Sequence, residues 1–315
     1  MKIIVTGGAG FIGSHLVDSL VKNGHTVVVV DNLSSGYFWN IPKGVDFINA
    51  DLGEEKSYDL LPKEKFDAVY HLASHVGQEL SFQKPIYDIK SNAVSTVVMF
   101  KWCMEWGVKR FIFASSVNVY GPIKTYPVDE NTRTNPKSPY AVGKIASEYL
   151  CRIYQDFGIN ITILRLFNIY GPRQDIDNIN QGMASIYMSY VAKKDPILIK
   201  GSLDRFRDFT YVTDAAEAFS KCLENSKTFG KTYVLSSGVK TTVKQLIEEI
   251  ILTYGYDPET YPVQLDKPTR NDQFGFYGDS SALISDIEWK PKVSLKEGLT
   301  NMKNWVYEFR KSNKI

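Results

Sequence analysis

The sequence predicts an α/β fold in which a doubly wound parallel sheet is joined to a smaller, interleaved α/β portion. Short β-branched runs alternate with helical stretches through the first half of the 315 residues. Alternation of this kind implies right-handed crossovers between parallel strands, with helices on both faces of the sheet. A glycine-rich turn also joins the first strand to the first helix, at the edge where open parallel sheets bind ligands.

The opening turn carries Gly7, Gly10 and Gly13 between an apolar strand and an apolar-periodic helix. Glycine at this spacing lets the backbone turn tightly and approach a pyrophosphate, and the helix N-terminus offers N–H groups to the phosphates. A second strand, expected over 26–30, ends at Asp31. An acid there can accept hydrogen bonds from an adenosine ribose and would repel a 2′-phosphate. The strand–turn–helix context favours a dinucleotide site, with NAD preferred over NADP, over an ordinary turn.

The remaining elements follow in order along the chain. Further strands are expected over 45–49, 66–71, 110–114 and 160–166, and helices over 96–106 and 141–157. After about Phe167, repeated prolines break the chain into shorter pieces, with helices over 181–194, 213–225, 242–254 and 295–311 and strands near 197–199, 207–211, 232–235 and 275–278. We predict an NAD-binding domain over 1–167 and a mostly substrate-binding portion over 168–315, interleaved with the first.

Composition narrows the class of protein. A net charge of +2 gives no electrostatic case for a nucleic-acid or membrane partner. The three cysteines are far apart in sequence, which argues against a disulfide framework and is consistent with a cytoplasmic location. His71 and His75 lie four positions apart, but no glutamate or further histidine completes a metal set, so no metal is expected.

Tyr140 and Lys144 form the candidate reactive pair. Their spacing of four places the phenol and the ammonium on one face of the expected helix. A nearby cation stabilises a phenolate, so we expect the pKa of Tyr140 to fall toward the working pH. The same spacing recurs twice later in the chain and is not diagnostic alone. What distinguishes Tyr140 is the presence of Ser115 and Ser116 at the end of the strand expected over 110–114.

Together these motifs resemble the extended short-chain dehydrogenase/reductase family, and within it the NAD-dependent epimerases and dehydratases. The closest likeness is to nucleotide-sugar 4-epimerases of the UDP-glucose type. The resemblance implies a Rossmann-type fold, bound NAD, a nucleotide-sugar substrate and a homodimer formed by helices near 92–106 and 140–157. The matching segments cover nearly the whole chain in order: 6–13, 31, 51–52, 71–74, 115–116, 119–121, 140–144, 166–173 and 207–212.

The resemblance also implies roles for individual residues. Tyr140 would be the acid–base, Lys144 would hold the nicotinamide ribose, and Ser116 would share the substrate hydroxyl. The implied cofactor contacts are Gly7, Gly10, Phe11, Ile12, Gly13, Asp31, Asn32, Asp51, Leu52, Leu72, Ala73, Asn92, Tyr140 and Lys144. The implied substrate contacts are Ser116, Asn168, Arg207, Arg270 and Phe276. Guanidinium groups suit a diphosphate, although Arg207 could instead form a structural salt bridge.

The type of reaction depends on the two positions after Ser116. Sugar dehydratases of this family carry an Asp-Glu pair there, whereas this chain has Val117 and Asn118. The glutamate of the decarboxylating relatives is absent from the same stretch. We therefore expect epimerisation, at C4, through a transient keto-sugar. One alternative is that a residue far from Ser116 in sequence supplies the missing acid. The others are a 3,5-epimerase step, a net dehydrogenase or reductase acting on a nucleotide-sugar, and a non-catalytic NAD-binding regulator.

Two further positions bear on the substrate. Lys200 replaces the aromatic residue that stacks on uracil in many relatives, which leaves the base open to GDP-, CDP- or dTDP-sugars. Phe276 falls near a position where bulk limits the C2 substituent of the sugar. That bulk predicts a preference for glucose and galactose over their N-acetylated forms.

Overall fold

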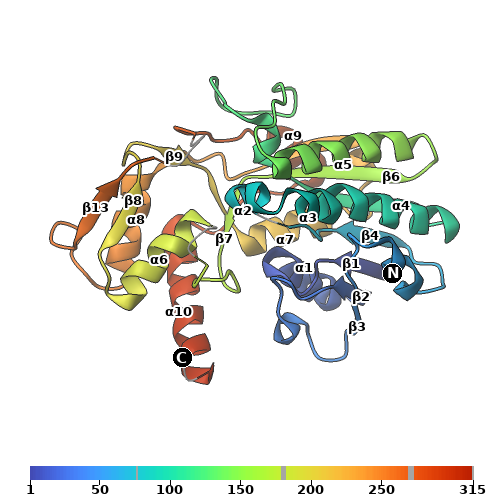
Figure 1. The fold of residues 1–315 in the computed structure, drawn as a ribbon, viewed down its shortest axis with the longest axis horizontal. Coiled ribbons are helices and arrows are strands. Elements are labelled where there is room, and N and C mark those ends of the chain that lie inside the picture. Colours follow the sequence, from blue (N-terminus) through green and yellow to red (C-terminus); the bar gives the residue numbers. More distant parts are fainter. Residues whose placement is uncertain (76, 179–181, 269–272, 314–315) are drawn as a thin grey trace.

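A seven-stranded parallel sheet forms the centre of the computed structural model, which describes residues 1–75, 77–178, 182–268 and 273–313 (Figure 1). The strand order is β11-β6-β5-β4-β1-β2-β3, and every pairing is parallel. This order confirms the predicted doubly wound fold. The strands are β1 (Lys2–Thr6), β2 (Thr26–Asp31), β3 (Asp46–Asn49), β4 (Ala68–His71), β5 (Arg110–Ser116), β6 (Asn160–Leu166) and β11 (Lys231–Leu235).

Helices cover both faces of this sheet. Alternate strand residues face opposite sides, so Ile3 and Val5 pack in one core and Ile4 packs in the other. The first core contains α1 (Phe11–Lys22), α7 (Val212–Lys221) and α9 (Ser281–Ile287). The second contains α4 (Ser95–Glu105) and α5 (Pro139–Gln155).

The segment before α4 is helical, which the sequence analysis did not anticipate. It consists of α2 (Gln78–Gln83), α3 (Pro85–Ile89) and a π-helical turn, η3 (Lys90–Val94), that leads into α4. Pro85 occupies the first turn of α3, where its fixed φ is tolerated. Short 3₁₀ turns are η1 (Phe38–Asn40), η2 (Glu55–Leu60), η4 (Val117–Tyr120) and η5 (Ser226–Thr228).

The second half of the chain supplies a smaller layer beside the sheet. Its core is formed by α6 (Met183–Lys193), α8 (Val243–Thr253) and α10 (Leu295–Asn313) with short strand pairs. The pairs are β7 (Asn168–Tyr170) with β10 (Phe209–Tyr211), β8 (Ile197–Lys200) with β13 (Val263–Asp266), and β9 (Phe206–Arg207) with β12 (Thr241–Thr242). Every residue of β13 is exposed, so this strand has no alternating pattern to predict it.

Two strand predictions in this half are wrong in detail. The strand expected over 207–211 is split into β9 and β10. No strand forms over 275–278, where only Gly275 and Gly278 make isolated bridges. A Cβ at 275 would lie 2.3 Å from the ring of Phe206. The segment around Gly275 therefore passes too close to Phe206 for a regular β-ladder with side chains at every position.

Elements from the second half of the chain also join the main sheet and its helical cover. β11 comes from the second half of the sequence and extends the sheet beyond β6. α7 packs against α1, and the Tyr70 hydroxyl of β4 donates to the Phe219 carbonyl of α7 at 3.1 Å. Among the residues that the structure describes, no helix is long and apolar enough to cross a membrane.

Candidate active site

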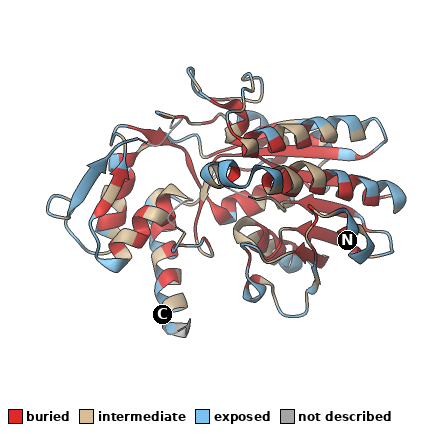
Figure 2. Cartoon of the chain, viewed as in Figure 1, coloured by how far each residue is buried: buried red, intermediate tan, exposed pale blue. Residues whose placement is uncertain are grey.

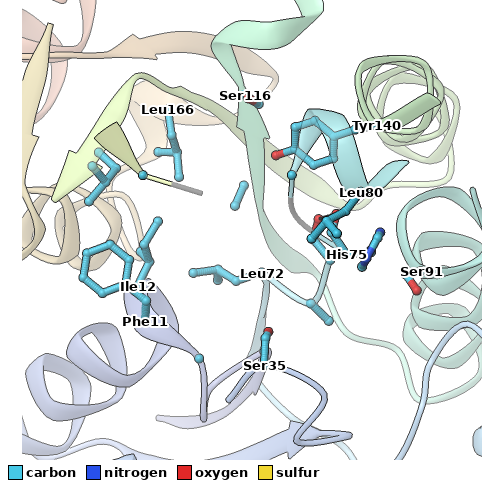
Figure 3. Close-up of a pocket in the computed structure, with 18 of the residues that line it drawn as sticks. Phe11, Ile12, Ser35, Leu72, His75, Leu80, Ser91, Ser116, Tyr140 and Leu166 are labelled. Atoms are coloured by element: carbon cyan, nitrogen blue, oxygen red, sulfur yellow. Dashed lines mark hydrogen bonds between the residues drawn. The ribbon is translucent and has the colours of Figure 1, made fainter. Parts of the chain in front are cut away.

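A cavity of about 1620 Å³ opens at the carboxyl edge of the sheet and is lined by both halves of the chain (Figure 3). It brings together most of the predicted site residues: Gly7, Gly10, Phe11, Ile12, Gly13, Asp31, Asn32, Asp51, Leu52, Leu72, Ala73, Ser116, Tyr140, Lys144, Asn168, Arg207 and Phe276. Asn92 is not part of this lining, because its side chain is buried behind it. Arg270 lies outside the described residues.

The glycine turn at the end of β1 is packed so closely that side chains would not fit. Gly7 has φ +71°, and a Cβ there would lie 2.7 Å from the backbone nitrogen of Ala73. A Cβ on Gly13 would lie 2.1 Å from the Gly7 carbonyl oxygen. Gly10 is the N-cap residue of α1 and offers no side chain to the helix N-terminus. The turn therefore leaves a backbone cradle at a helix N-terminus, which fits the pyrophosphate of a dinucleotide.

Asp31 stands at the end of β2 and ties this turn to the neighbouring strand. Its carboxylate accepts the N–H of Ala9 at 3.0 Å and the N–H of Leu33 at 2.8 Å. Burial raises the pKa of Asp31, while its backbone hydrogen bonds lower it. Beside it, the Asn32 amide donates to Asp51 at 3.0 Å. Buried Asp31 and partly buried Asp51 thus offer acceptors beside the glycine turn, an arrangement that fits the adenosine ribose of NAD.

Ser116 and Tyr140 converge at the opposite part of the cavity. Ser116 is the last residue of β5, and its Oγ accepts the N–H of Asn118 at 3.2 Å. Tyr140 lies in the first turn of α5, which begins where the Ser138 hydroxyl accepts the N–H of Ala141 at 3.2 Å. The side chains of Ser116 and Tyr140 are hydrogen-bonded. Figure 3 shows the Tyr140 hydroxyl pointing into the open space above Leu72.

Ser115 and Ser116 differ in role because successive strand residues point to opposite faces. The Ser115 hydroxyl donates to Glu148 at 2.6 Å. Glu148 in turn accepts two hydrogen bonds from Arg165, at 2.9 and 2.7 Å, inside the protein. Ser115 therefore fastens β5 to α5, and Ser116 is the hydroxyl that faces Tyr140.

The expected fall in the pKa of Tyr140 is wrong for this structure. Burial raises that pKa to about 12, against the opposing effect of the Ser116 hydrogen bond. Burial also lowers the pKa of Lys144 to about 8. The Lys144 ammonium donates to the Ala114 carbonyl at 2.9 Å and lies 5.9 Å from the Tyr140 ring centroid. Loss of water around each group is the largest cause of its shift.

Arg207 and Phe276 form the wall contributed by the second half. The guanidinium of Arg207 donates to the carbonyls of Phe206 at 2.8 Å and Gln273 at 2.9 Å, and its centre lies 4.7 Å from the Phe276 ring. Phe276 packs edge-on against Phe167 at 5.7 Å. Arg207 therefore holds the segment around 273–276 against the cavity, beside Asn168 at the start of β7.

Several residues that line the cavity were not singled out from the sequence. Ser91, Gln174 and Gln273 each place a side-chain oxygen that is buried and has no hydrogen-bond partner within the described part of the chain. His75 also lines the cavity, whereas His71 is fully buried and bonded to the Thr6 hydroxyl at 2.7 Å. The sequence pattern carries no signal for the three oxygens, since their position depends on contacts between distant segments.

Comparison with known proteins gives a consistent picture. The model of the NAD dependent epimerase/dehydratase family matches residues 3–236. A putative UDP-glucose 4-epimerase of Methanocaldococcus jannaschii is 35% identical over 306 residues, covering 96% of this chain and 98% of the relative. UDP-glucuronic acid decarboxylase 1 of Arabidopsis thaliana is 31% identical over 324 residues, covering 98% of this chain and 70% of the relative.

Solved structures agree over nearly the whole chain. The UDP-glucose 4-epimerase of Thermotoga maritima, solved with UDP-glucose, has a TM-score of 0.90 at 34% identity and covers 99% of this chain and 100% of its own. The UDP-glucose 4-epimerase of Thermus thermophilus, solved with NAD, has a TM-score of 0.87 at 30% identity, covering 98% and 99%. These likenesses support the fold and the cofactor inferred from the cavity.

Proposed function

The chain belongs to the NAD dependent epimerase/dehydratase family, and we propose that it interconverts a UDP-sugar of the glucose type with its C4 epimer. The observation that carries this proposal is the convergence of Ser116 and Tyr140 on the cavity that contains the glycine turn. A hydroxyl pair at this edge can exchange a proton with an alcohol beside the cofactor. The reaction then has no net redox change.

Three residues of the chain have distinct roles in the proposed reaction. Tyr140, in its phenolate form, accepts the proton of the sugar hydroxyl and as a phenol later returns it, and Ser116 holds that hydroxyl in place. Lys144 supplies positive charge beside the phenol. Because burial holds the pKa of Tyr140 near 12, added positive charge in the cavity favours its action as a base. Bound NAD supplies the acceptor and donor for hydride.

Val117 and Asn118 support epimerisation over dehydration. Both line the cavity directly after Ser116, and neither side chain can act as an acid or a base. Elimination of water from the keto-sugar needs such a group. Return of the hydride to the other face of the ketone needs no acid or base other than Tyr140. The simplest outcome is therefore inversion of C4.

A panel of nucleotide-sugars tests the proposal directly. The purified protein is incubated without added cofactor, and the stereochemistry of the sugar is followed by NMR. We expect interconversion of UDP-glucose and UDP-galactose. A requirement for stoichiometric NAD would instead indicate a net dehydrogenase or reductase, and release of carbon dioxide from UDP-glucuronic acid would indicate a decarboxylase. GDP-, CDP- and dTDP-sugars in the panel address Lys200, which lines the cavity where a base could bind.

Tyr140→Phe tests the catalytic assignment. Removal of the hydroxyl should lower kcat by about 10²–10⁴-fold, the usual contribution of a positioned acid–base group. Tyr307→Phe is the matched control, since Tyr307 lies in α10 and is 70% exposed. Full activity of Tyr140→Phe would rule out the proposed chemistry and favour a non-catalytic NAD-binding protein.

We also propose that the protein is a cytoplasmic homodimer. α4 and α5 lie side by side, and both have exposed positions along them (Figure 2). The exposed apolar side chains on these two helices are Val97, Met104, Val142, Tyr149 and Ile153. Their spacing places them along one stripe of each helix, as expected for a helical interface. A light-scattering mass near 35.7 kDa, the mass of one chain, would contradict the dimer. Tyr149→Glu combined with Ile153→Glu should convert a dimer to that mass.

A further inference from the structure

A second polar network stands behind Tyr140 and Lys144, and the proposed reaction does not use it. Its centre is Asp88 in α3, whose side chain has no exposed surface. His75 Nδ1 lies 3.0 Å from one Asp88 oxygen, and Asn92 Nδ2 lies 3.3 Å from the other. Asn92 also donates to the Asp88 carbonyl at 2.9 Å. A carboxylate buried this deeply is stable only with such partners.

The network is in direct contact with the helix that carries Lys144. A Cβ at Gly143 would lie 2.8 Å from the Cβ of Asn92, so the absence of a side chain lets α5 touch the π-helical turn. The Asn92 carbonyl then accepts the Ser147 hydroxyl of α5 at 3.0 Å. The helix that carries Lys144 therefore packs directly on the segment that holds Asp88. Lys144 and Asp88 are both buried, so a buried ammonium and a buried carboxyl group stand on two elements in contact.

Two acids influence Lys144, and they are compensated differently. Glu148, one turn further along α5, accepts two hydrogen bonds from the guanidinium of Arg165, which balances its charge. Asp88 is held by an imidazole and an amide, and an imidazole can donate a hydrogen bond without being charged. The other titratable neighbours of Lys144 are Tyr140, Cys151 and His71.

The direction of the pKa shifts agrees with this geometry. Burial lowers the pKa of Lys144 to about 8, and Asp88 is the leading influence that opposes the fall. Reciprocally, burial raises the pKa of Asp88, while His75 and Lys144 lower it. Without Asp88, the cost of burying the ammonium would be larger and Lys144 would lose its proton at lower pH.

We propose that Asp88 is the counter-charge that keeps Lys144 protonated beside Tyr140, and that His75 is a positioning residue that holds the Asp88 carboxylate in place. The inference rests on the proposed roles of Tyr140 and Lys144. Tyr87 contributes from the same helix as Asp88, since its ring packs edge-on against His75 at 5.2 Å. α3 therefore contacts the imidazole through two residues, Asp88 and Tyr87.

A thermal double-mutant cycle on the NAD-loaded protein tests the charge coupling without any measurement of activity. Asp88→Asn keeps the shape of the side chain, and Lys144→Met removes the ammonium. We expect Asp88→Asn to lower Tm by about 2–4 °C when Lys144 is present and by much less in the Lys144→Met background. Equal losses in both backgrounds would overturn the proposal, because Asp88 would then act on packing alone.

The pH dependence of epimerisation provides the second measurement. Loss of the Lys144 proton defines an alkaline limb, so Asp88→Asn should move that limb to lower pH, by about one unit for a 1.4 kcal/mol interaction. Glu54→Gln is the control, because Glu54 is a surface acid that pairs at 2.9 Å with Lys90, the first residue of η3 directly after α3. It should leave the limb unchanged. An Asp88→Asn profile identical to that of Glu54→Gln would overturn the proposal.

Variants of His75 distinguish its role in positioning the Asp88 carboxylate from the charge that Asp88 itself supplies. They also provide a test if Asp88→Asn does not fold. His75→Gln retains a donor for Asp88 and should keep the alkaline limb in place, whereas His75→Leu should move it as Asp88→Asn does. Identical profiles for the two variants would refute the role of His75. If Tyr140→Phe were fully active, the proposed function would fail, yet the thermal cycle would still decide the Asp88–Lys144 coupling.

Discussion

The cavity has two walls that are built by different means: a cofactor wall around Gly7 and Gly13, and a substrate wall around Arg207 and Phe276. On the cofactor side, backbone meets backbone, with Gly13 against the Gly7 carbonyl and Gly7 against Ala73. On the substrate side, a single polar side chain can hold several loops together through hydrogen bonds to their backbone. Asp208, fully buried, accepts the N–H groups of Ser237 at 2.7 Å, Gly238 at 2.9 Å and Gly278 at 3.1 Å. The first wall depends on the absence of side chains at fixed positions, and the second on the presence of a few polar ones.

Gly13→Ala is expected to break the cofactor wall and to have the largest effect of these changes. The added Cβ would lie 2.1 Å from a main-chain oxygen that cannot move without displacing the whole turn. We expect a loss of bound NAD together with a loss of stability beyond the roughly 1–3 kcal/mol typical of overpacking. The measurements are the NAD content of the purified protein and its chemical denaturation.

Gly24→Ala is the control for that experiment. Gly24 also has a positive φ, +81°, but no atom lies within 4 Å of the position that the alanine methyl group would occupy. Backbone strain alone should cost about 1–2 kcal/mol and leave the NAD content unchanged. Similar behaviour of both variants would show that close packing is not what distinguishes the cofactor wall.

Asp208→Asn is the corresponding break in the substrate wall. An amide offers one acceptor oxygen, so its NH₂ group would face donors that the carboxylate now satisfies. Leaving buried donors unpaired costs about 1–3 kcal/mol each, so we expect the free energy of unfolding to fall by about 3 kcal/mol. Asp204→Asn, at an exposed position in the preceding loop, should change it by less than about 0.5 kcal/mol. Chemical denaturation of the two variants measures the difference.

Acid should weaken the cofactor wall through His71. Burial, with the nearby charge of Lys144, lowers the pKa of His71 from 6.5 to about 3. In the unfolded chain His71 binds a proton below about pH 6.5, whereas in the folded chain it stays neutral until about pH 3. Stability is therefore lost as the pH falls through this window. The loss due to His71 is about 2 kcal/mol between about pH 7 and pH 5.

His71→Gln should remove that part of the pH dependence, measured as the difference in unfolding free energy between about pH 7 and pH 5. His25→Gln is the comparison, because His25 is only partly buried near the N-terminus. An unchanged pH dependence in His71→Gln would mean that His71 is already protonated in the fold.

The same contrast explains what could be predicted from the sequence. The glycine spacing, Asp31 and β6 over 160–166 follow local rules, because a turn, a strand end and a buried strand each impose a residue type at a position. The substrate wall follows no local rule. The strand expected over 275–278 fails because Phe206, far away in sequence, lies against Gly275.

The candidate site shows a similar division. Sequence placed Ser116, Tyr140 and Lys144 together, since strand ends and helix faces have fixed geometry. It could not give the pKa of Tyr140, which depends on how completely the fold removes water from the phenol. It also missed Asp88, because the approach of α3 and η3 to α5 depends on Gly143 fitting against Asn92 of η3.

Phe276→Ala tests the substrate wall alone, and of these changes it should have the smallest effect. Phe276 lines the cavity and is bounded by Phe167 and Arg207, so its removal enlarges the substrate wall without touching the cofactor wall. We expect the ratio of kcat/KM for N-acetylated over plain UDP-sugars to rise about tenfold, equivalent to about 1.4 kcal/mol. Phe274→Ala is the matched control, because Phe274 is 58% exposed and is not part of the cavity lining. A Phe276→Ala variant with no gain on N-acetylated sugars, while still folded and active on UDP-glucose, would show that the C2 substituent is limited elsewhere.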